Sequence, residues 1–376
     1  MENMNIKKVI FCEIAWMKNY CGVTEEDKPV NVGKYINDNG RGGEIYNFAP
    51  HNHKCFGYVM HYGEELHIER YDKILKNHSE VTDMTVVWVA TKGDKCKIVG
   101  WYEHATMYRS WQSFRDFIIG DEWYDYNFVA DEKSCYLIPE EKRDFVIPGA
   151  LKAGKGRGMG RSHVWYADSR YAQEEVVPEV LSYLDSVRDI CTPIYYLPEE
   201  IERRADDKGD TTEALLDECE KAVKEGRYLD AMAVANLAVD KDDRYDTRLM
   251  RAEMFMSFLL YDEAEEEYKR ALYHEENTNA MALLMDLEIV LEHTFLAIEL
   301  GEKLRKRKEE TEHWDGVASN LAYLYIGEGQ LDAAEALIQE CEEGSDSGNH
   351  EWIDEARKNM LNYKEQIGVR FPICGL

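Results

Sequence analysis

The second half of the chain repeats a helix-like pattern at a nearly constant interval. Four alanines, Ala231, Ala264, Ala297 and Ala334, occupy matching positions in similar segments and are separated by 33, 33 and 37 residues. Each segment follows another stretch whose apolar residues recur at intervals of three and four, such as DTRLMRAEMFMSFL (246–259), which is typical of an amphipathic helix. A small residue fits where two helices cross closely, so the pattern predicts a stack of helical hairpins.

This pattern resembles a tetratricopeptide repeat (TPR) array over about residues 210–343. The third unit departs most, because it lacks the Gly and Tyr that precede the alanine in other units. The resemblance implies an all-α solenoid at 211–365 that recruits a protein or peptide partner on its surface. Two alternatives remain open, in which the helices only dimerise the protein or brace the first domain.

Length and charge divide the chain. A chain of 376 residues is too long for one ordinary core and predicts two domains. The net charge is −29, and residues 1–200 carry 24 Lys and Arg against 32 Asp and Glu, whereas the remainder carries 21 against 42. The acidic second half would be repelled by a phosphate backbone, so any nucleic-acid contact is expected in the first half.

The first half reads as β-rich. Turn signals such as KGDK (92–95) separate short strand-like runs, and TVVWVATKGDKCKIVGWY (85–102) predicts a hairpin with its turn at Gly93 and Asp94. One amphipathic helix is expected at 176–187. The fold class is therefore α+β with two domains: a mostly-β barrel with flanking helices at 1–195, a linker at 196–210, the repeats at 211–365 and a tail at 366–376. The predicted strands are 8–16, 43–49, 55–60, 84–91, 96–103, 126–130, 135–138 and 144–148.

Few motifs carry recognisable chemistry. Nine dispersed cysteines without a CxxC pair indicate reduced thiols and a cytoplasmic protein, and no transmembrane segment or signal peptide is expected. The glycines of GKGRGMG (154–160) do not stand between a strand and a helix, and no Walker lysine is present, so no nucleotide cofactor is expected. No catalytic constellation is apparent. The residues His51, His53, Cys55 and His61 lack a second clustered pair, which favours a structural loop over a zinc site and leaves no metal expected.

Aromatic and basic residues in the first half suggest a different role. A barrel this small cannot bury all of its aromatic side chains, and an aromatic slot can hold a flat base by stacking. The glycine–arginine segment GKGRGMGRSHVW places Lys155, Arg157 and Arg161 among glycines that let backbone N–H groups approach a phosphate. These three cations are the predicted nucleic-acid contacts, with a merely mobile loop as the alternative.

The first half also resembles a known superfamily. The segments VVWVAT, KIVGWYEHATMYR and GRGMGRSHVWYAD, with the opening FCEIAWMKNYCG, are similar to the PUA-like superfamily, in particular its EVE- and YTH-like modules, over about residues 5–170. That resemblance implies binding of a modified base in DNA or RNA, and it suggests a role in bacterial defence. By position it implies a base pocket formed by Trp88 and Trp101, with Tyr102 and Trp165 as weaker candidates. The compact EVE signature after a glycine–aspartate pair is not recognisable.

Three functions compete at this point. The leading hypothesis is a non-catalytic reader of modified nucleic acid whose TPR-like repeats recruit a protein. The second is an interaction scaffold that binds no nucleic acid, and the third is an enzyme with an unrecognised site in the aromatic cleft. The sequence does not distinguish DNA from RNA or give the oligomeric state.

Overall fold

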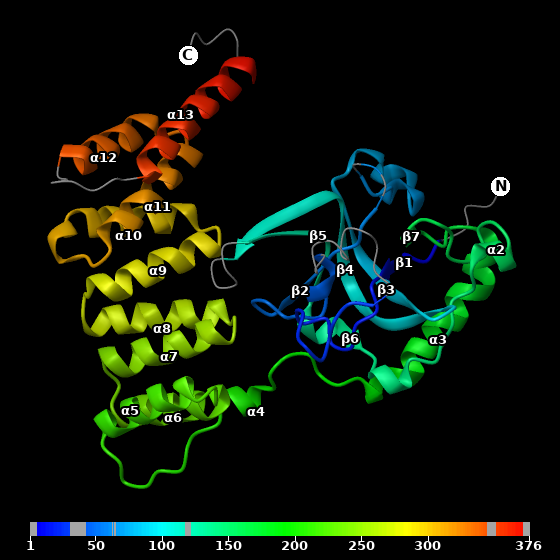
Figure 1. Cartoon of the computed structure of the whole chain (residues 1–376), viewed down its shortest axis with the longest axis horizontal. Helices are drawn as coiled ribbons and strands as arrows, with labels where there is room; N and C mark the ends of the chain where they lie inside the picture. The colour runs from blue at the N-terminus through cyan, green and yellow to red at the C-terminus, as the bar shows by residue number, and fades with distance from the viewer. Residues whose placement is uncertain are drawn as a thin grey trace. The chain divides into compact units, whose positions relative to one another are not determined.

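The computed structural model describes residues 6–30, 43–61, 63, 65–116, 122–343 and 351–370. The chain divides into two compact units, Met1–Glu200 and Ile201–Leu376 (Figure 1). We call them the β unit and the helical unit, and describe each by itself. The short helix α4 (Pro198–Ile201) lies at the boundary.

The β unit is built on one mixed sheet. Its strands pair in the order β2-β5-β4-β3-β1-β7, and β6 pairs with β4. The strand β1 runs parallel to β3, whereas the other pairs are antiparallel. The strands are β1 (Val9–Ile14), β2 (Lys54–Gly57), β3 (Glu80–Lys92), β4 (Lys95–Asp116), β5 (Glu122–Asp131), β6 (Cys135–Leu137) and β7 (Val164–Trp165).

The hairpin of β3 and β4 is the centre of this sheet. It turns at Gly93, whose φ of 67° suits glycine, so the predicted hairpin is confirmed. β4 also bonds to β6 at Gly100–Tyr102, and its second half, from Thr106 to Asp116, bonds to β5. Two predicted strands are wrong: residues 43–46 form a short 3-10 helix, and Val146 makes only a single bridge to Lys97.

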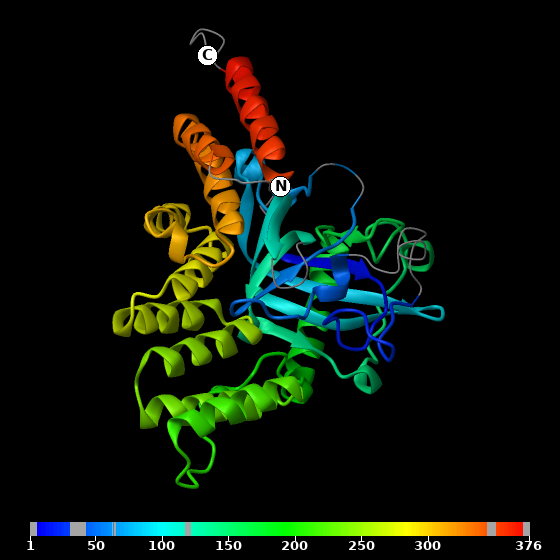
Figure 2. The same ribbon diagram turned by 60° about the vertical axis from the view of Figure 1, so that its left-hand side comes forward.

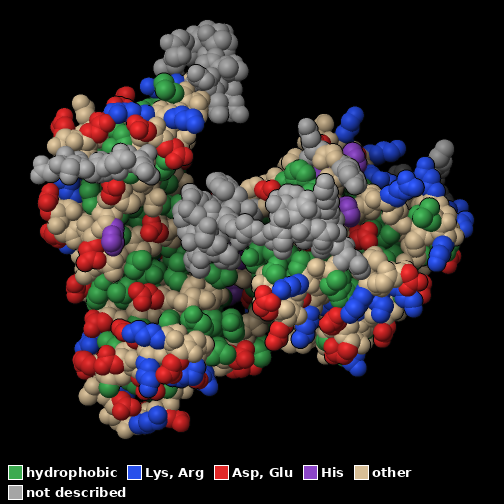
Figure 3. All heavy atoms as spheres, viewed as in Figure 1, with side chains coloured by type: hydrophobic (Ala, Val, Ile, Leu, Met, Phe, Trp, Pro, Cys, Tyr) green, Lys and Arg blue, Asp and Glu red, His purple; other side chains and the backbone are tan. Residues whose placement is uncertain are grey.

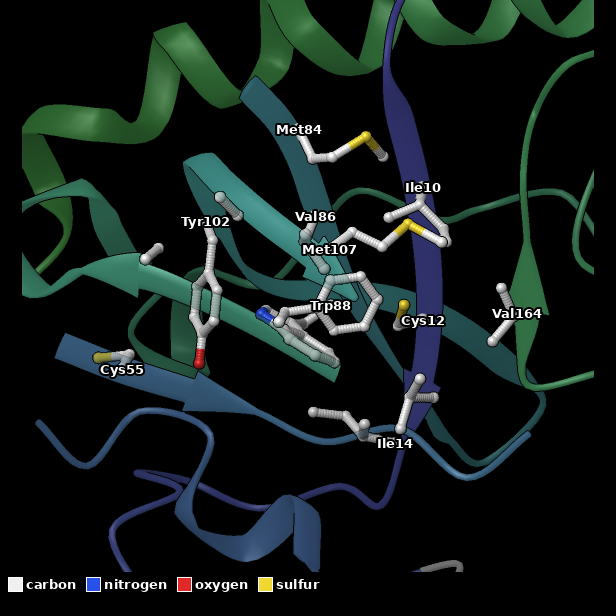
Figure 4. Close-up of a cluster of buried hydrophobic side chains, with 14 of the residues drawn as sticks. Ile10, Cys12, Ile14, Cys55, Met84, Val86, Trp88, Tyr102, Met107 and Val164 are labelled. Atoms are coloured by element: carbon white, nitrogen blue, oxygen red, sulfur yellow. The ribbon is translucent and has the colours of Figure 1, made fainter. Parts of the chain in front are cut away.

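Both faces of the central strands are buried, which explains their nearly continuous apolar sequence. On β3, Val86, Trp88 and Ala90 face the main core shown in Figure 4. The alternate residues Val87 and Val89 face a second cluster that contains side chains of α3 (Val177–Val187). The helix predicted at 176–187 is thereby confirmed, because its apolar stripe covers the outer face of the sheet. A four-residue helix, α2 (Ala150–Ala153), precedes β7.

The helical unit is a stack of antiparallel helix pairs (Figure 2). Side-chain caps begin α5 and α9, where Thr211 accepts from the N–H of Ala214 and Asn277 from that of Asn279. The helices are α5 (Thr212–Lys224), α6 (Tyr228–Lys241), α7 (Tyr245–Ser257), α8 (Tyr261–His274), α9 (Thr278–Val290), α10 (Thr294–Arg305), α11 (Trp314–Gly327), α12 (Leu331–Glu343) and α13 (Glu351–Arg370).

Two sets of equivalent residues define the repeat. The alanines Ala231, Ala264, Ala297 and Ala334 are all completely buried, as expected at close helix crossings. The turn inside each pair contains one residue with a left-handed backbone, and these residues keep the spacing of the alanines. They are Gly226 (φ 73°), Leu259 (57°), Glu292 (60°) and Gly329 (71°). The two-domain α+β fold class, with a TPR-like helical solenoid as its second part, is confirmed.

The third pair lacks the glycine found in the first and fourth turns, and polar contacts hold its turn instead. Glu292 takes the left-handed position, and the next residue, His293, places Nδ1 2.7 Å from a carboxylate oxygen of the buried Glu288. The backbone N–H of His293 also donates to the carbonyl of Glu288 at 2.8 Å. This turn is therefore held by a side chain of the preceding helix, whereas the first and fourth pairs have glycine at the left-handed position.

Candidate functional site

The four aromatic residues predicted to form a base pocket are core side chains. Trp88, Trp101 and Tyr102 are completely buried, and Trp165 is 9% exposed. The ring of Trp88 lies 5.3 Å from that of Tyr102 (Figure 4). The hydroxyl of Tyr102 donates to the backbone carbonyl of Asn47. In this structure none of the four rings offers an open face on which a base could stack.

The structure also separates these residues onto opposite faces of the sheet. Trp88 and Tyr102 belong to the main core, whereas Trp101 and Trp165 belong to the cluster under α3. Trp101 stacks on Tyr136 with ring centroids 4.7 Å apart and donates from Nε1 to Glu103 at 3.1 Å. Strand alternation places adjacent residues on opposite faces, so Trp101 and Tyr102 cannot line one slot.

The glycine–arginine segment is an ordered loop packed against the chain before it. A Cβ on Gly158 would lie 1.9 Å from the carbonyl oxygen of Pro148, so only glycine permits this approach. The next residue, Met159, donates to that same carbonyl at 2.9 Å and accepts from the N–H of Ala150 at 2.6 Å. Gly158 therefore allows the loop to pack and hydrogen-bond against the backbone of residues 148–150.

The three predicted phosphate contacts point into solvent. Lys155, Arg157 and Arg161 are exposed, and none of them forms an ion pair with any residue the structure describes. The guanidinium carbon of Arg157 lies 4.6 Å from the ring centroid of Tyr171. Figure 3 shows Lys and Arg side chains gathered on the side of the β unit that carries α2. These cations are available to an anionic partner.

The histidine-rich segment does not converge on a metal. Cys55 is completely buried in the core, and His53 contacts Glu132 at 3.0 Å. His61 lies farther on, with its ring 4.5 Å from that of Trp111. Over the described part of the chain, the residues that come close enough to share a metal ion are Glu265, Glu288 and His293 in the helical unit.

That carboxylate–histidine group already holds a cation. The ammonium of Lys269 contacts Glu265 and lies 3.6 Å from the carboxylate of Glu288. Burial raises the pKa of Glu288, and its hydrogen bond from His293 opposes that shift. The group therefore works as an ion-pair network around the buried Glu288, between the second and third helix pairs.

Sequence reasoning missed a face formed by the first helices of the pairs. Residues at equivalent repeat positions line up on it, and we call this set the first-helix face. It comprises Glu220 on α5, Met250, Glu253 and Met256 on α7, and Leu283, Asp286 and Ile289 on α9. These residues recur at the same 33-residue interval as the buried alanines. That interval was the feature of the sequence from which this face could have been predicted.

Two carboxylates of this face, those of Glu253 and Asp286, lack cationic partners among the described residues, whereas Glu220 contacts the ammonium of Lys224 at 3.3 Å. Glu253 and Asp286 are exposed, and neither forms an ion pair with a described residue; Asp286 accepts one hydrogen bond from Asn320 at 2.9 Å. Desolvation nevertheless raises the pKa of both carboxyls, and the charge of Glu220 raises that of Glu253 further. Both carboxyls are therefore partly desolvated by their neighbours although solvent still reaches them.

Apolar side chains flank these carboxylates. Met250, Met256, Leu283 and Ile289 are half-buried and pack against the cores of the helix pairs with their remaining surface exposed. The first-helix face thus combines partly exposed apolar side chains with unpaired negative charge.

Comparisons with known proteins identify no family. No family model matches the chain, and no curated protein sequence matches it. Solved structures resemble the helical unit. A tetratricopeptide repeat protein from Parabacteroides merdae is 16% identical over 43% of this chain and 68% of its own, with a TM-score of 0.35.

Two further structures match at similar levels. MamA is 16% identical over 44% of this chain and 98% of its own, with a TM-score of 0.33. YrrB, a TPR protein with an unusual peptide-binding site, is 17% identical over 45% of this chain and 90% of its own, with a TM-score of 0.34. Among the described helices, none has the length and apolar character needed to cross a bilayer.

Proposed function

We propose that the helical unit binds a segment of a partner protein on the first-helix face. The observation that carries this proposal is the pair of exposed, desolvated carboxylates, Glu253 and Asp286, that recur at one repeat position without a cationic partner. Such charges cost stability in the free protein, and they become favourable when a Lys or Arg side chain approaches them.

The chemistry of this face defines the partner. Half-buried methionine, leucine and isoleucine side chains beside the carboxylates suit an extended segment that carries both apolar and basic residues. Methionine adapts its shape readily, which favours contact with side chains of different sizes. The proposed partner is therefore a basic, amphipathic protein segment.

Fluorescence polarisation with two series of short labelled peptides tests this proposal on the full chain. The peptides share their apolar residues and differ only in carrying Lys or Glu. We expect only the Lys series to bind, with affinity falling as salt rises. Glu253→Gln with Asp286→Asn should weaken binding by about two- to thirty-fold, because each exposed ion pair contributes about 0.2–1 kcal/mol.

A matched variant controls for net charge. Glu309→Gln with Asp332→Asn removes the same two charges from exposed positions outside the first-helix face, and it should leave binding unchanged. Equal binding of both peptide series, or equal loss in both variants, would reject this face as the site.

A second function is favoured by the basic loop of the β unit. We propose that Lys155, Arg157 and Arg161 contact the phosphates of DNA or RNA, since they are exposed and unpaired in a chain of net charge −29. The PUA-like resemblance extends this proposal to a reader of modified bases, in which the loop supplies affinity and a separate site recognises the base.

Salt dependence tests the loop. Replacing the three cations with alanine should weaken binding to all nucleic acids alike and reduce the slope of log K against log salt by up to about three. Replacing three exposed lysines elsewhere in the β unit, Lys73, Lys95 and Lys133, is the matched control. An unchanged slope in the loop variant, or the same loss in both variants, would remove the loop from the interface.

A further inference from the structure

The β unit contains buried polar side chains that have no hydrogen-bond partner among the described residues. Both ring nitrogens of His61 and both amide atoms of Asn127 are buried and unpaired, and so is the indole nitrogen of Trp88. His61 is 6% exposed, and the other two side chains are completely buried. An unpaired buried polar group costs about 1–3 kcal/mol, so each one calls for an explanation.

An irregularity in the sheet lies beside both His61 and Asn127. On β5, Tyr126 pairs with Gln112 and Phe128 pairs with Met107. Asn127 therefore stands opposite the four β4 residues 108–111, which form a wide bulge. The last of these, Trp111, places its ring 4.5 Å from the ring of His61. Trp88 packs on Phe128, with ring centroids 5.5 Å apart, and strand alternation directs Phe128 and Asn127 to opposite faces of the sheet, so Trp88 is not part of this place.

The bulge is firmly held. The guanidinium of Arg109 donates to the carbonyls of Leu75, Lys76 and His78 at 2.9–3.0 Å, and to Glu69 at 2.8 Å. The backbone of Arg109 also bonds to Leu66 and Ser79, at 2.7 Å in each case. A bulge fixed by so many contacts is a defined feature of the fold, and β-bulges are frequent beside binding sites because they redirect side chains.

The unpaired groups are neutral near neutral pH. Desolvation, followed by the nearby charge of His67, lowers the pKa of His61, so its imidazole offers one donor and one acceptor. The amide of Asn127 offers two donors and one acceptor. The one cation in the bulge, Arg109, is already neutralised by Glu69. Among the described residues of the bulge, no charge is left unpaired for an ionic ligand.

We propose that His61 and Asn127 form a binding site for a neutral chemical group that presents a hydrogen-bond donor beside an acceptor. A nucleobase edge and a primary carboxamide both have this chemistry, and an asparagine amide pairs well with either. Trp111 is 36% exposed and offers an aromatic surface on the solvent side of the site. The site rests on the buried polar groups of the β unit and needs neither the basic loop nor the first-helix face.

Stability measurements on the ligand-free full chain provide the first test. Asn127→Leu replaces an unpaired amide by an apolar group of similar size, so it should raise the melting temperature of the β unit. The matched control is Asn47→Leu in the same unit. Asn47 is also completely buried, but it bonds to the backbone of Tyr58 through both amide atoms, at 2.9 and 3.0 Å. This variant should lower the melting temperature.

Titration of the full chain with free nucleosides, base-methylated nucleosides and simple carboxamides provides the second test. We expect one class to bind, which identifies the source of the group, and Asn127→Leu to weaken that binding at least about tenfold. His61→Phe keeps an aromatic ring beside Trp111, removes the two nitrogens and should also weaken binding.

Two outcomes would overturn the proposal. One is that no compound of either class binds. The other is that Asn127→Leu lowers the melting temperature as Asn47→Leu does while binding is unchanged, which would mean that internal water satisfies the amide as part of the core.

Discussion

The two units reach a packed core by opposite routes. The β unit surrounds large rings, such as Trp88, Trp101 and Tyr102, with strands that come from distant parts of the sequence. The helical unit places a small residue, such as Ala264, at each helix crossing and repeats that solution at a fixed interval. The contrast shows why candidate binding residues are easier to locate in the helical unit. There, each exposed residue can be compared with the residues at the same position of the other repeats.

The largest expected effect comes from removing a central ring of the β unit. Trp88→Ala should destabilise that unit by about 3–5 kcal/mol, because a completely buried large side chain leaves a cavity. Calorimetry of the full chain should show the melting transition of the β unit shifted and that of the helical unit in place. Trp111→Ala, at a partly exposed position, is the control and should cost far less. A shift of both transitions by Trp88→Ala would show that the units do not unfold separately.

Overfilling a helix crossing tests the opposite kind of core. Ala264→Trp should destabilise the helical unit by about 1–3 kcal/mol or more, because the completely buried methyl group has no space beside it. The same substitution at the exposed Ala214 is the control. Denaturant unfolding followed by helix content measures both variants. Tolerance of Trp at position 264 would contradict the close crossing that defines the repeat.

The left-handed turns predict a gain in stability. Glu292 is exposed and adopts φ 60°, which is unfavourable for a residue with a side chain. Glu292→Gly should stabilise the helical unit by about 0.5–1 kcal/mol, after the entropic cost of glycine in the unfolded chain is subtracted. Glu292→Ala keeps the steric conflict and should give no gain. A gain with Ala as large as with Gly would assign the effect to charge.

The smallest effect concerns pH. Glu253 and Asp286 have raised pKa values in the folded protein, so the folded state holds their protons more tightly than the unfolded state does. The stability contributed by protonation is complete in acid and is lost as pH rises through the folded pKa values. Glu253→Gln with Asp286→Asn should therefore stabilise the helical unit at pH 7, by no more than about 0.5 kcal/mol at exposed sites. The gain should vanish in acid; a gain independent of pH would contradict the desolvation of these carboxyls.

Local patterns explain which parts of the fold the sequence predicted. The alanine spacing and the hairpin turn at Gly93 depend on neighbouring residues, and both predictions are confirmed. The parallel pairing of β1 with β3 depends on contacts between Val9 and Thr85, which no local pattern reveals. The segment at 43–46 has strand-like residues but forms a 3-10 helix, because its tertiary surroundings override its propensity.

The candidate sites were less predictable than the fold. The sequence indicated that Trp88 and Trp101 are important, but it did not reveal that alternation along the strands buries them on opposite faces. His61 was noticed only as a possible zinc ligand, and Asn127 carried no signal, since the absence of a hydrogen-bond partner is a property of the packed chain. The first-helix face was within reach, because its carboxylates follow the same period as the alanines.

The position of β1 has a consequence for synthesis on the ribosome. β1 is made well before its antiparallel neighbour, β7, in which Trp165 pairs with Phe11. At ordinary translation rates that neighbour follows on the order of ten seconds or more later. During this interval the apolar outer face of β1 has neither β7 nor α3 to cover it, which makes the nascent β unit a natural client for chaperones. The helical unit has no such delay, because each new pair docks on the one made just before it.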